Sequence, residues 1–361
     1  MLDWLRLART PEVGPATFAQ LIARFGSAAS ALEELPRLAR RGGGKIFVPA
    51  TEEDTAREWE ALEKVGGRLV LSCDPDFPEG LAALAPPPPL ISVLGALPRR
   101  DMIAIVGARN ASALARKFAQ LLAHELGEAG LAVVSGLARG IDSAAHEAAL
   151  KHGTVAVVAG GVDVIYPPEN ESLYRAIVEQ GAVISEMPFG EAPQARHFPR
   201  RNRLISGLSR GVIVVEAAEK SGSLITTDYA LEQGREIFAV PGSPLDLRAR
   251  GANRLIRDGA TLIESAQDVL AVLNPILGRA AAQAAPSPAP QMTLALDADP
   301  DQLRRRIEEA LGTTPVEMDE LIRQLGADPS AVQTAILELE LAGRCRRHPG
   351  NWVSWAALPA V

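Results

Sequence analysis

The sequence is poor in the residue types on which several classes of protein depend. Its 361 residues include two cysteines, Cys73 and Cys345, which form no C-x-x-C pair, and five scattered histidines. We therefore expect neither a disulfide scaffold nor a clustered metal site. The first residues contain no apolar run long enough for a signal peptide or a membrane-spanning helix, which predicts a cytoplasmic protein without membrane contact.

Lysine and aromatic residues are also scarce. Five of the 37 basic residues are lysine, and aromatic residues make up 4% of the chain. The net charge of −7 disfavours a polyanionic partner, because the summed field would repel it. The arginines are nevertheless concentrated, with five in residues 196–210 and four in residues 247–257, and neither stretch contains a carboxylate. These stretches indicate nucleic acid or a nucleotide phosphate as a ligand, although an arginine-rich genome explains any single arginine equally well.

Hydrophobic residues make up 47% of the chain and charged residues 22%, which is typical of chains that fold around a core. A length of 361 residues predicts two or three domains. We place a helical domain at residues 1–66, an α/β domain at residues 67–274, an Ala/Pro linker at residues 275–298 and a winged-helix domain at residues 299–361.

The central region repeats one pattern, in which a short β-branched run is followed by a helical pattern. The runs begin at Met102, Leu131, Thr154, Ala182, Gly211, Glu236 and Thr261. Their starts are 23 to 29 residues apart, which leaves room for a crossover helix each time, and continuous apolar runs are typical of strands covered on both faces. The pattern predicts an α/β fold with a doubly wound, mainly parallel sheet. Two earlier runs, from Arg68 and Leu90, are separated by prolines and are expected at one edge of the sheet.

Helical patterns precede the central region. Residues 10–15 predict a tight hairpin, and a helix over residues 16–25 follows it, an arrangement similar to a helix-hairpin-helix. Such a hairpin can present backbone amides to a DNA phosphate. Because the hairpin contains neither lysine nor arginine, a small packing module is the favoured interpretation.

The C-terminal region predicts three helices and a β-hairpin, which are the elements of a winged helix. The predicted helices are residues 301–311, a second that begins at Pro315 with a Thr314–Glu317 capping box, and residues 329–341 after an Asp328 cap. The third helix carries Glu338 and Glu340 and no basic residue. We therefore expect a protein contact at least as much as major-groove reading of DNA.

Four loops that follow the predicted strands are unusual, and ligands of open α/β sheets bind at this end of the strands. The first loop, Val106–Ser112, lacks the G-x-G-x-x-G spacing that a dinucleotide requires. NAD and FAD are not expected, and no cofactor is predicted. The loop offers Arg109 at a strand end and Ser112 as a helix cap, which suit one phosphate.

The second loop, residues 135–142, has two glycines in a short turn that opens a helix carrying His146 and His152. Glycine permits close approach of a ligand to the backbone, and a helix start supplies unpaired amides. An anion cradle and a plain strand-to-helix connection are both compatible with this pattern. Asp142 and His146 lie four residues apart on one helical face, as an acid/base pair or, more commonly, a structural ion pair would.

Of the two remaining loops, one places an aromatic ring among arginines, and the other places small residues at the start of a helix. Residues 196–203 place Phe198 among four arginines, just before a helix expected to begin near Arg201. Stacking together with phosphate neutralisation is what single-stranded nucleic acid requires, whereas a solvated charge run would need neither Phe198 nor Asn202. The helix start after Glu216 offers further candidate phosphate contacts at Ser221, Gly222, Ser223 and Thr226.

These loops carry a resemblance that spans the central region. The stretches VGARNAS, SGLARGIDSAAHEAAL, GTVAVVAGGVDVIYPPEN, HFPRRNRLISGLS and VVEAAEKSGSLITTDYALEQGRE occur in this order and are similar to the DprA/Smf family, the DNA-processing proteins of natural transformation. The match runs from about Val106 to Ala260, and SCDPDFPEGL extends it back to Ser72. The resemblance implies an extended Rossmann-like core that binds single-stranded DNA without sequence preference, forms a homodimer and helps load the recombinase RecA. It also implies a sterile-alpha-motif-like N-terminus and, in many members, a C-terminal winged helix.

The resemblance also implies a set of DNA-binding residues. The family's pocket corresponds here to Arg109, Ser135, Gly136, Ala138, Arg139, Gly140, Phe198, Arg201, Asn202 and Arg203. In this assignment Gly136 and Gly140 let a phosphate approach the backbone. Arg109 and Arg203 neutralise the phosphate, and Phe198 offers a face for a base. No residue is assigned to catalysis or to a metal, so we expect a non-enzymatic protein that protects incoming DNA and loads RecA.

The alternative interpretation is an enzyme. Nucleotide phosphoribohydrolases of the lysine-decarboxylase-like type use a related core with glycine loops and a small-residue helix start. Their signature is a G-G-G loop and P-G-G-x-G-T followed by a carboxylate, whereas Gly160–Gly161 and Pro241–Gly242 stand in other contexts here. A third interpretation, a transcription regulator that uses the winged helix, is disfavoured by the acidic third helix.

Overall fold

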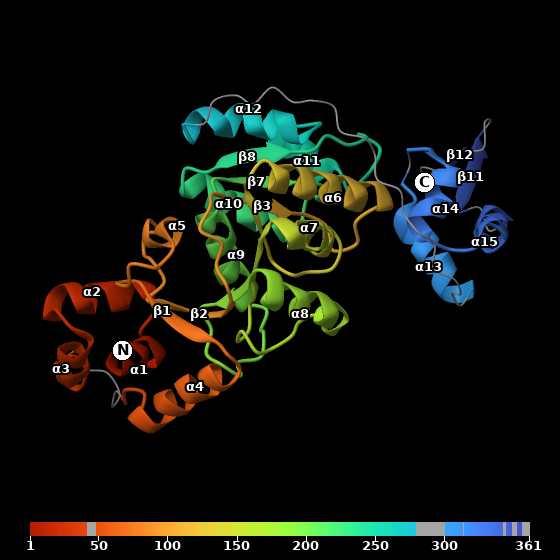
Figure 1. Ribbon diagram of the computed structural model, residues 1–361. Coiled ribbons are helices and arrows are strands. Elements are labelled where there is room, and N and C mark those ends of the chain that lie inside the picture. Colours follow the sequence, from red (N-terminus) through yellow and green to blue (C-terminus); the bar gives the residue numbers. More distant parts are fainter. Residues whose placement is uncertain (42–47, 279–299, 313, 342–343, 349–351, 356–361) are drawn as a thin grey trace.

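The computed structural model describes residues 1–41, 48–278, 300–312, 314–341, 344–348 and 352–355. A helical N-terminal domain, a central α/β domain and a winged helix follow one another along the chain (Figure 1). This architecture confirms the predicted fold class. The linker expected at residues 275–298 starts within helix α12 (Ala266–Ile276), and its part beyond residue 278 lies outside the described residues.

The central domain is built on one nine-stranded sheet in the order β1-β2-β6-β5-β4-β3-β7-β8-β9. The strands are β1 (Arg68–Leu71), β2 (Leu90–Gly95), β3 (Met102–Val106), β4 (Ala132–Ser135), β5 (Thr154–Val157), β6 (Ala182–Ser185), β7 (Gly211–Val214), β8 (Glu236–Ala239) and β9 (Thr261–Leu262). Strands β3 to β9 are parallel, and β1 and β2 add an antiparallel edge beside β6. All nine runs predicted from the sequence are confirmed as strands.

Helices cover both faces of this sheet, because alternate residues of each strand point to opposite faces. In β3, Ala104 and Val106 pack toward one helical layer, and Ile103 and Ile105 pack toward the other. Burial on both faces explains why the strands are apolar throughout. The first layer contains α9 (His197–Leu208), α10 (Ser223–Glu232) and α11 (Arg250–Arg257), and the second contains α6 (Ala113–Glu128), α7 (Ile141–Ala149) and α12.

The chain reverses its direction across the sheet between β3 and β7. It passes from β3 outward to β4, β5 and β6, and after α9 it returns to pair β7 on the other side of β3. Ligands of open α/β sheets bind beyond the carboxyl ends of the strands near such a reversal.

Four further helical elements complete this domain. They are α8 (Glu171–Gln180), the short helix α5 (Glu79–Ala82) and the two 3₁₀ turns η1 (Leu150–His152) and η2 (Pro168–Asn170).

The N-terminal domain is joined to the antiparallel edge of the sheet through its first helix. Leu7 packs inside the domain, whereas Leu5 packs into the cluster at the sheet edge, and the Trp4 indole donates a 2.8 Å hydrogen bond to the Pro89 carbonyl. The helix expected after the hairpin is confirmed, with Gly14 as its N-cap. The domain consists of α1 (Leu2–Arg9), α2 (Pro15–Phe25), α3 (Ala28–Arg41) and α4 (Glu52–Lys64).

The winged helix has the expected order of elements, with one correction. It consists of α13 (Pro300–Ala310), β10 (Val316–Glu317), α14 (Met318–Leu325), α15 (Pro329–Leu341), β11 (Cys345–His348) and β12 (Trp352–Trp355). The capping box predicted for the second helix is wrong. Val316 and Glu317 pair with β12 as a short strand, so the helix begins only at Met318. Asp328 caps the third helix as predicted and accepts a 3.0 Å hydrogen bond from the Ala331 amide.

The winged helix contacts the central domain through one arginine and the start of α6. The guanidinium of Arg248 donates to the carbonyls of Glu309 and Leu311 at the end of α13. Ala113, at the start of α6, is part of the hydrophobic core of the winged helix, and Lys117 forms an ion pair with Glu320. These contacts place the domain against the side of the sheet that α6 covers (Figure 1).

Within the described residues, no helix has both the length and the apolar character that crossing a membrane requires. The same part of the chain holds no group of three or more His, Cys, Asp or Glu side chains placed to bind a metal ion. Both cysteines are free thiols, Cys73 at the surface and Cys345 in the core of the winged helix.

Candidate nucleic-acid interface

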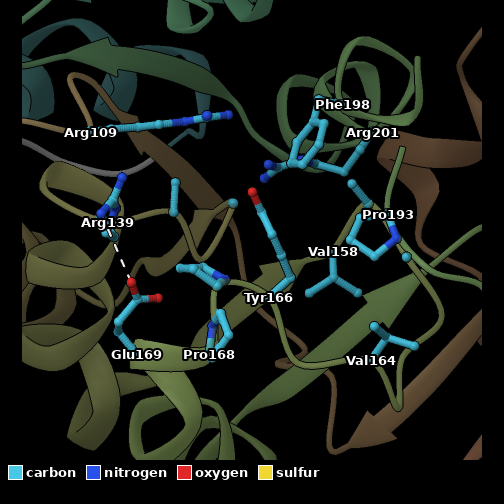
Figure 2. Close-up of a pocket in the computed structure, with 15 residues that line it drawn as sticks. Arg109, Arg139, Val158, Val164, Tyr166, Pro168, Glu169, Pro193, Phe198 and Arg201 are labelled. Carbon is cyan, nitrogen blue, oxygen red and sulfur yellow. Dashed lines mark ion pairs between the residues drawn. The ribbon is translucent and has the colours of Figure 1, made fainter. Parts of the chain in front are cut away.

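A cavity of about 180 Å³ lies beyond the carboxyl ends of β3, β4 and β5. Figure 2 shows arginine side chains and two aromatic rings converging on it from separate segments of the chain. Six of the residues predicted to bind DNA line this cavity, namely Arg109, Gly136, Ala138, Arg139, Phe198 and Arg201. The structure therefore brings together residues from three of the four loops that the sequence singled out.

The floor of the cavity is the guanidinium of Arg201. Its side chain comes from α9 and is buried, with 8% of its surface exposed, and Nη1 donates a 3.1 Å hydrogen bond to the Val157 carbonyl at the end of β5. The guanidinium lies directly against Gly136, where a Cβ atom would stand 1.5 Å from Nη1. A glycine is thus required at position 136 because a larger residue would collide with Arg201, and not only because a ligand approaches the backbone.

Asp142 shapes the loop beside this buried charge. Its carboxylate accepts hydrogen bonds from the amides of Gly136 (3.0 Å) and Ala138 (3.4 Å). Burial raises the pKa of Asp142, and the charge of Arg201 opposes that rise. Burial also lowers the pKa of Arg201 to about 10, which the Asp142 charge opposes in turn. The two buried groups therefore favour each other's charged form beneath the cavity.

His146 serves this region as a neutral structural residue. It is fully buried, and its Nδ1 shares a 2.7 Å hydrogen bond with the Thr154 hydroxyl. Burial, followed by the charge of Arg201, lowers the pKa of His146 to about 3. Asp142 binds loop amides while His146 binds Thr154, so neither the acid/base nor the ion-pair interpretation describes these residues. The helix predicted to carry both histidines is also shorter than expected, because α7 ends at Ala149.

The wall of the cavity is the ring of Phe198, which is half buried. The Cζ atom of Arg109 lies 5.5 Å from the ring centroid and that of Arg201 lies 6.0 Å away. Tyr166 approaches the same ring with 5.8 Å between centroids and a 59° tilt. Cations at such distances are attracted to the ring face, so this arrangement fixes an aromatic surface beside two positive charges.

Phe198 lies within α9 because this helix begins earlier than the sequence suggested. The helix was expected near Arg201 but starts at His197, which places Phe198 in its first turn. Pro199 is the next residue, and a proline in the first turn of a helix loses no hydrogen bond. The prediction was wrong because this proline lies at a position that helices tolerate.

Two exposed arginines stand at the rim. Arg139 is 3.9 Å from a carboxylate oxygen of Glu169, the pair that the dashed line marks in Figure 2, and exposed Arg109 lies on the same side of the cavity. Gly140 follows Arg139 with φ of 81°, and a Cβ there would lie 2.3 Å from the Ala108 carbonyl. Glycine at this position therefore lets the two arginine-bearing loops pack against each other.

Four predicted residues lie outside the cavity lining. Besides Gly140, they are three residues whose side chains bind the protein itself. The Ser135 hydroxyl is fully buried and donates to the Ile105 carbonyl at 2.6 Å. The Asn202 amide donates to the Gly222 carbonyl at 3.3 Å. Arg203 forms an ion pair with Glu186, and 15% of its side chain is exposed.

The proposed phosphate contacts at helix starts are also engaged within the fold. Ser112 caps α6 as predicted, but its hydroxyl and its amide both bind the buried carboxylate of Glu216, at 2.8 Å and 3.1 Å. The place expected to hold a phosphate thus holds a carboxylate of the chain. Burial raises the pKa of Glu216, and Arg248 and Ser112 oppose that rise. At the start of α10 the Ser221 and Ser223 hydroxyls bind each other at 2.7 Å, Thr226 is buried, and Gly222 is exposed.

Part of the cavity lining was not singled out from the sequence. It consists of Val158, Ala159, Gly160, Val164, Tyr166, Pro167, Pro168, Glu169 and Pro193. Most of these residues lie in the stretch GTVAVVAGGVDVIYPPEN, where a glycine pair follows a strand and an aromatic residue precedes two prolines. That combination was the available signal, since glycines at a strand end and an exposed ring are both unusual features.

The contact between Gly136 and Arg201 yields a test of how the cavity floor is built. We expect Gly136→Ala to lower the free energy of unfolding by roughly 1 to 3 kcal/mol, because the new methyl group displaces a buried guanidinium. Gly222→Ala is the matched control, since φ there is −63° and a Cβ would meet nothing within 4 Å. Urea denaturation of both variants measures this loss of stability. Equal denaturation midpoints for the two variants would contradict the contact between Gly136 and Arg201.

Comparisons with known proteins agree with this arrangement. Residues 68–274 match the family model described as DNA recombination-mediator protein A, residues 1–61 match a DprA-like N-terminal HHH domain, and residues 281–351 match a DprA winged helix domain. The chain is 31% identical to Protein Smf of Synechocystis over 96% of each chain, and 38% identical to Protein Smf of Escherichia coli over 81% of this chain and 78% of that one.

Two solved structures are similar in fold and sequence. DNA processing protein A from Streptococcus pneumoniae superposes with a TM-score of 0.63 at 32% identity, covering 75% of this chain and 97% of that one. The second is DNA processing protein A from Helicobacter pylori, in a study of its single-stranded DNA binding mode, with a TM-score of 0.54 at 28% identity over 58% of this chain and 96% of that one. With its α/β core, both flanking domains and these matches, the chain belongs to the DprA/Smf family of DNA-processing proteins.

Proposed function

We propose that this protein binds single-stranded DNA without sequence preference in the cavity of Figure 2, and that binding rather than catalysis is its function. The observation that carries the proposal is the ring of Phe198, held beside Arg109 and Arg201. An aromatic platform next to arginines is the combination that single-strand binding requires, and stacking tolerates every base because each base has a π-face.

The residues of the cavity divide into two roles. A base stacks on Phe198 near Tyr166, and the exposed arginines at the rim, Arg109 and Arg139, neutralise phosphates. Arg201 lies too deep to follow a mobile phosphate and supplies a fixed positive charge beneath the bound nucleotide. The study of the Helicobacter pylori relative as a single-stranded DNA binder supports this proposal.

The predicted residues outside the cavity take supporting roles in this proposal. Asn202 and Arg203 fix α9 through Gly222 and Glu186, and Ser135 fixes the end of β4 through Ile105. We therefore assign them to the positioning of the cavity instead of direct contact with DNA.

The carboxylates near the cavity favour binding over hydrolysis. Asp142 accepts loop amides beneath the floor, and Glu216 caps α6. Glu169 lines the cavity but faces Arg139 at its exposed rim. A nucleotide hydrolase requires a carboxylate aimed at the reacting bond, and the three carboxylates described here are directed at other groups.

We further propose that the protein delivers the bound strand to RecA in the cytoplasm and acts as a homodimer. The description of the matched family as a recombination mediator supports this role. The strand must then remain accessible, and a cavity that opens at the carboxyl edge of the sheet leaves the flanking nucleotides free.

The stacking role of Phe198 is directly testable. Phe198→Ala should lower the affinity for oligo-dT roughly 5- to 150-fold, because base stacking contributes about 1 to 3 kcal/mol per base. The dependence on salt should not change, since stacking releases no counterions, and Phe198→Tyr should bind nearly as well as the parent protein. Fluorescence anisotropy measures the affinity and a thermal melt measures stability. A Phe198→Ala protein that melts normally and binds with undiminished affinity would exclude stacking.

The two arginine roles predict different salt dependences. Arg109→Ala should reduce the slope of log K against log salt by about 0.7, the value for one phosphate contact on a single strand. Arg203→Ala should leave the slope unchanged, because Glu186 already neutralises this side chain. Anisotropy titrations across a salt series provide both slopes. If Arg203→Ala reduces the slope as Arg109→Ala does, Arg203 contacts DNA and the supporting role assigned to it is wrong.

The winged helix is not expected to hold the strand, since two arginines at its wing are neutralised within the domain. Arg344 pairs with Glu308 at 2.5 Å and Arg347 pairs with Glu340 at 3.2 Å. A chain that ends at Gly278 should therefore keep the oligo-dT affinity of the full protein to within about threefold, well under the tenfold that 1.4 kcal/mol represents. A loss of tenfold or more in gel shifts or anisotropy would show that the winged helix holds DNA.

A further inference from the structure

A second cavity, of about 410 Å³, lies where the N-terminal hairpin meets the central domain. Val13 and Gly14 of the hairpin form one wall, and Met187 and Pro188, which follow β6, form the other. Arg200 of α9 lines the same space. We call this space the hairpin groove.

Arg9 fastens the two walls of the hairpin groove to each other. Its guanidinium forms an ion pair with Glu58 of α4 at 2.8 Å and donates a 3.0 Å hydrogen bond to the Glu186 carbonyl after β6. The Glu58 carboxylate also accepts the amide of Phe189 at 3.3 Å. The hairpin groove is therefore a built feature of the fold and not a loose seam between domains.

The hairpin groove and the first cavity are both lined by α9 and by the segment before it. Pro188 lines the hairpin groove and Pro193, five residues later, lines the first cavity. Arg200 and Arg201 are consecutive residues of α9, and successive side chains of a helix point about 100° apart. One turn of α9 thus presents one arginine to each cavity.

The charges of the hairpin groove leave Arg200 available to a ligand. Four charged residues line the groove, and two of them have partners, because Arg9 binds Glu58 and Glu186 binds Arg203. Among the described residues, exposed Arg200 has no ion pair, and Glu12 of the hairpin has none either. The remaining walls are apolar, so the hairpin groove offers the cation of Arg200 and the carboxylate of Glu12 beside apolar surface.

We propose that a single strand of DNA leaves the first cavity over the start of α9 and continues into the hairpin groove. Arg200 neutralises a phosphate there, and the apolar walls of Val13, Met187 and Pro188 contact a base. This inference rests on the proposed function, because it extends the binding path of the same strand. It gives the N-terminal domain a part in DNA binding that needs no basic residue in the hairpin itself.

Oligonucleotide length separates the hairpin groove from the first cavity. We would measure the affinity of the full chain for oligo-dT from about 4 to about 16 nucleotides, the range of single-strand site sizes. Arg200→Ala should bind the shortest oligonucleotides normally and the longest roughly tenfold more weakly, as expected for the loss of one charge-assisted hydrogen bond. Arg116→Ala, an exposed arginine of α6 that lines neither cavity, is the matched control and should bind every length normally.

A second variant blocks the hairpin groove without touching a charge. A Cβ at Gly14 would meet nothing within 4 Å, and its φ of −80° suits any residue, so Gly14→Leu fills space in the hairpin groove. It should weaken only the long oligonucleotides, with the salt slope unchanged. Normal binding of long oligonucleotides by both variants would overturn the inference, and so would an equal loss at every length. Failure of the proposed function is distinct, because Arg109→Ala would then bind the shortest oligonucleotides as well as the parent does.

Discussion

The electrostatic attraction between buried Arg201 and buried Asp142 is the interaction on which the candidate interface depends. Asp142 holds the loop after β4 by its amides, and Arg201 fills the space that Gly136 leaves open. Removing one of these two charges would leave the other buried without its counter-charge, which is unfavourable away from water. The arginine that gives the cavity its positive floor therefore also fixes the geometry of the loop above it and the position of Phe198 on α9.

The reversal of the sheet between β3 and β7 is occupied by the protein's own carboxylate. Glu216 follows β7 and satisfies the start of α6, where many α/β proteins bind a ligand phosphate. The open space is displaced toward β4 and β5, where arginines and aromatic rings replace helix amides as the binding groups. This displacement explains why the carboxyl edge of the sheet still forms a cavity although the protein lacks a dinucleotide-binding loop.

The sequence was sufficient to predict the strands, because their continuous apolar runs record burial on both faces. Loops rich in glycine and arginine indicated the segments of the cavity, and the resemblance to the DprA/Smf family implied six of the residues that line it. Contacts between distant residues could not be inferred in this way: Ser112 and Glu216 are 104 positions apart, and nothing local indicates that Arg203 closes on Glu186. The early start of α9 was missed because Pro199 lies in the first turn, where a helix tolerates proline. The strand at Val316 was missed because it forms only by pairing with β12, which is distant in the sequence.

The central claim is that the strand lies in the cavity formed by Phe198, Tyr166 and the surrounding arginines. Photo-crosslinking of oligo-dT to the full chain, followed by peptide mapping, tests this claim most directly. The account predicts adducts on the peptides that contain Tyr166 and Phe198, and their disappearance when unlabelled oligo-dT competes. Adducts confined to the winged helix, with these two peptides unmodified, would contradict it.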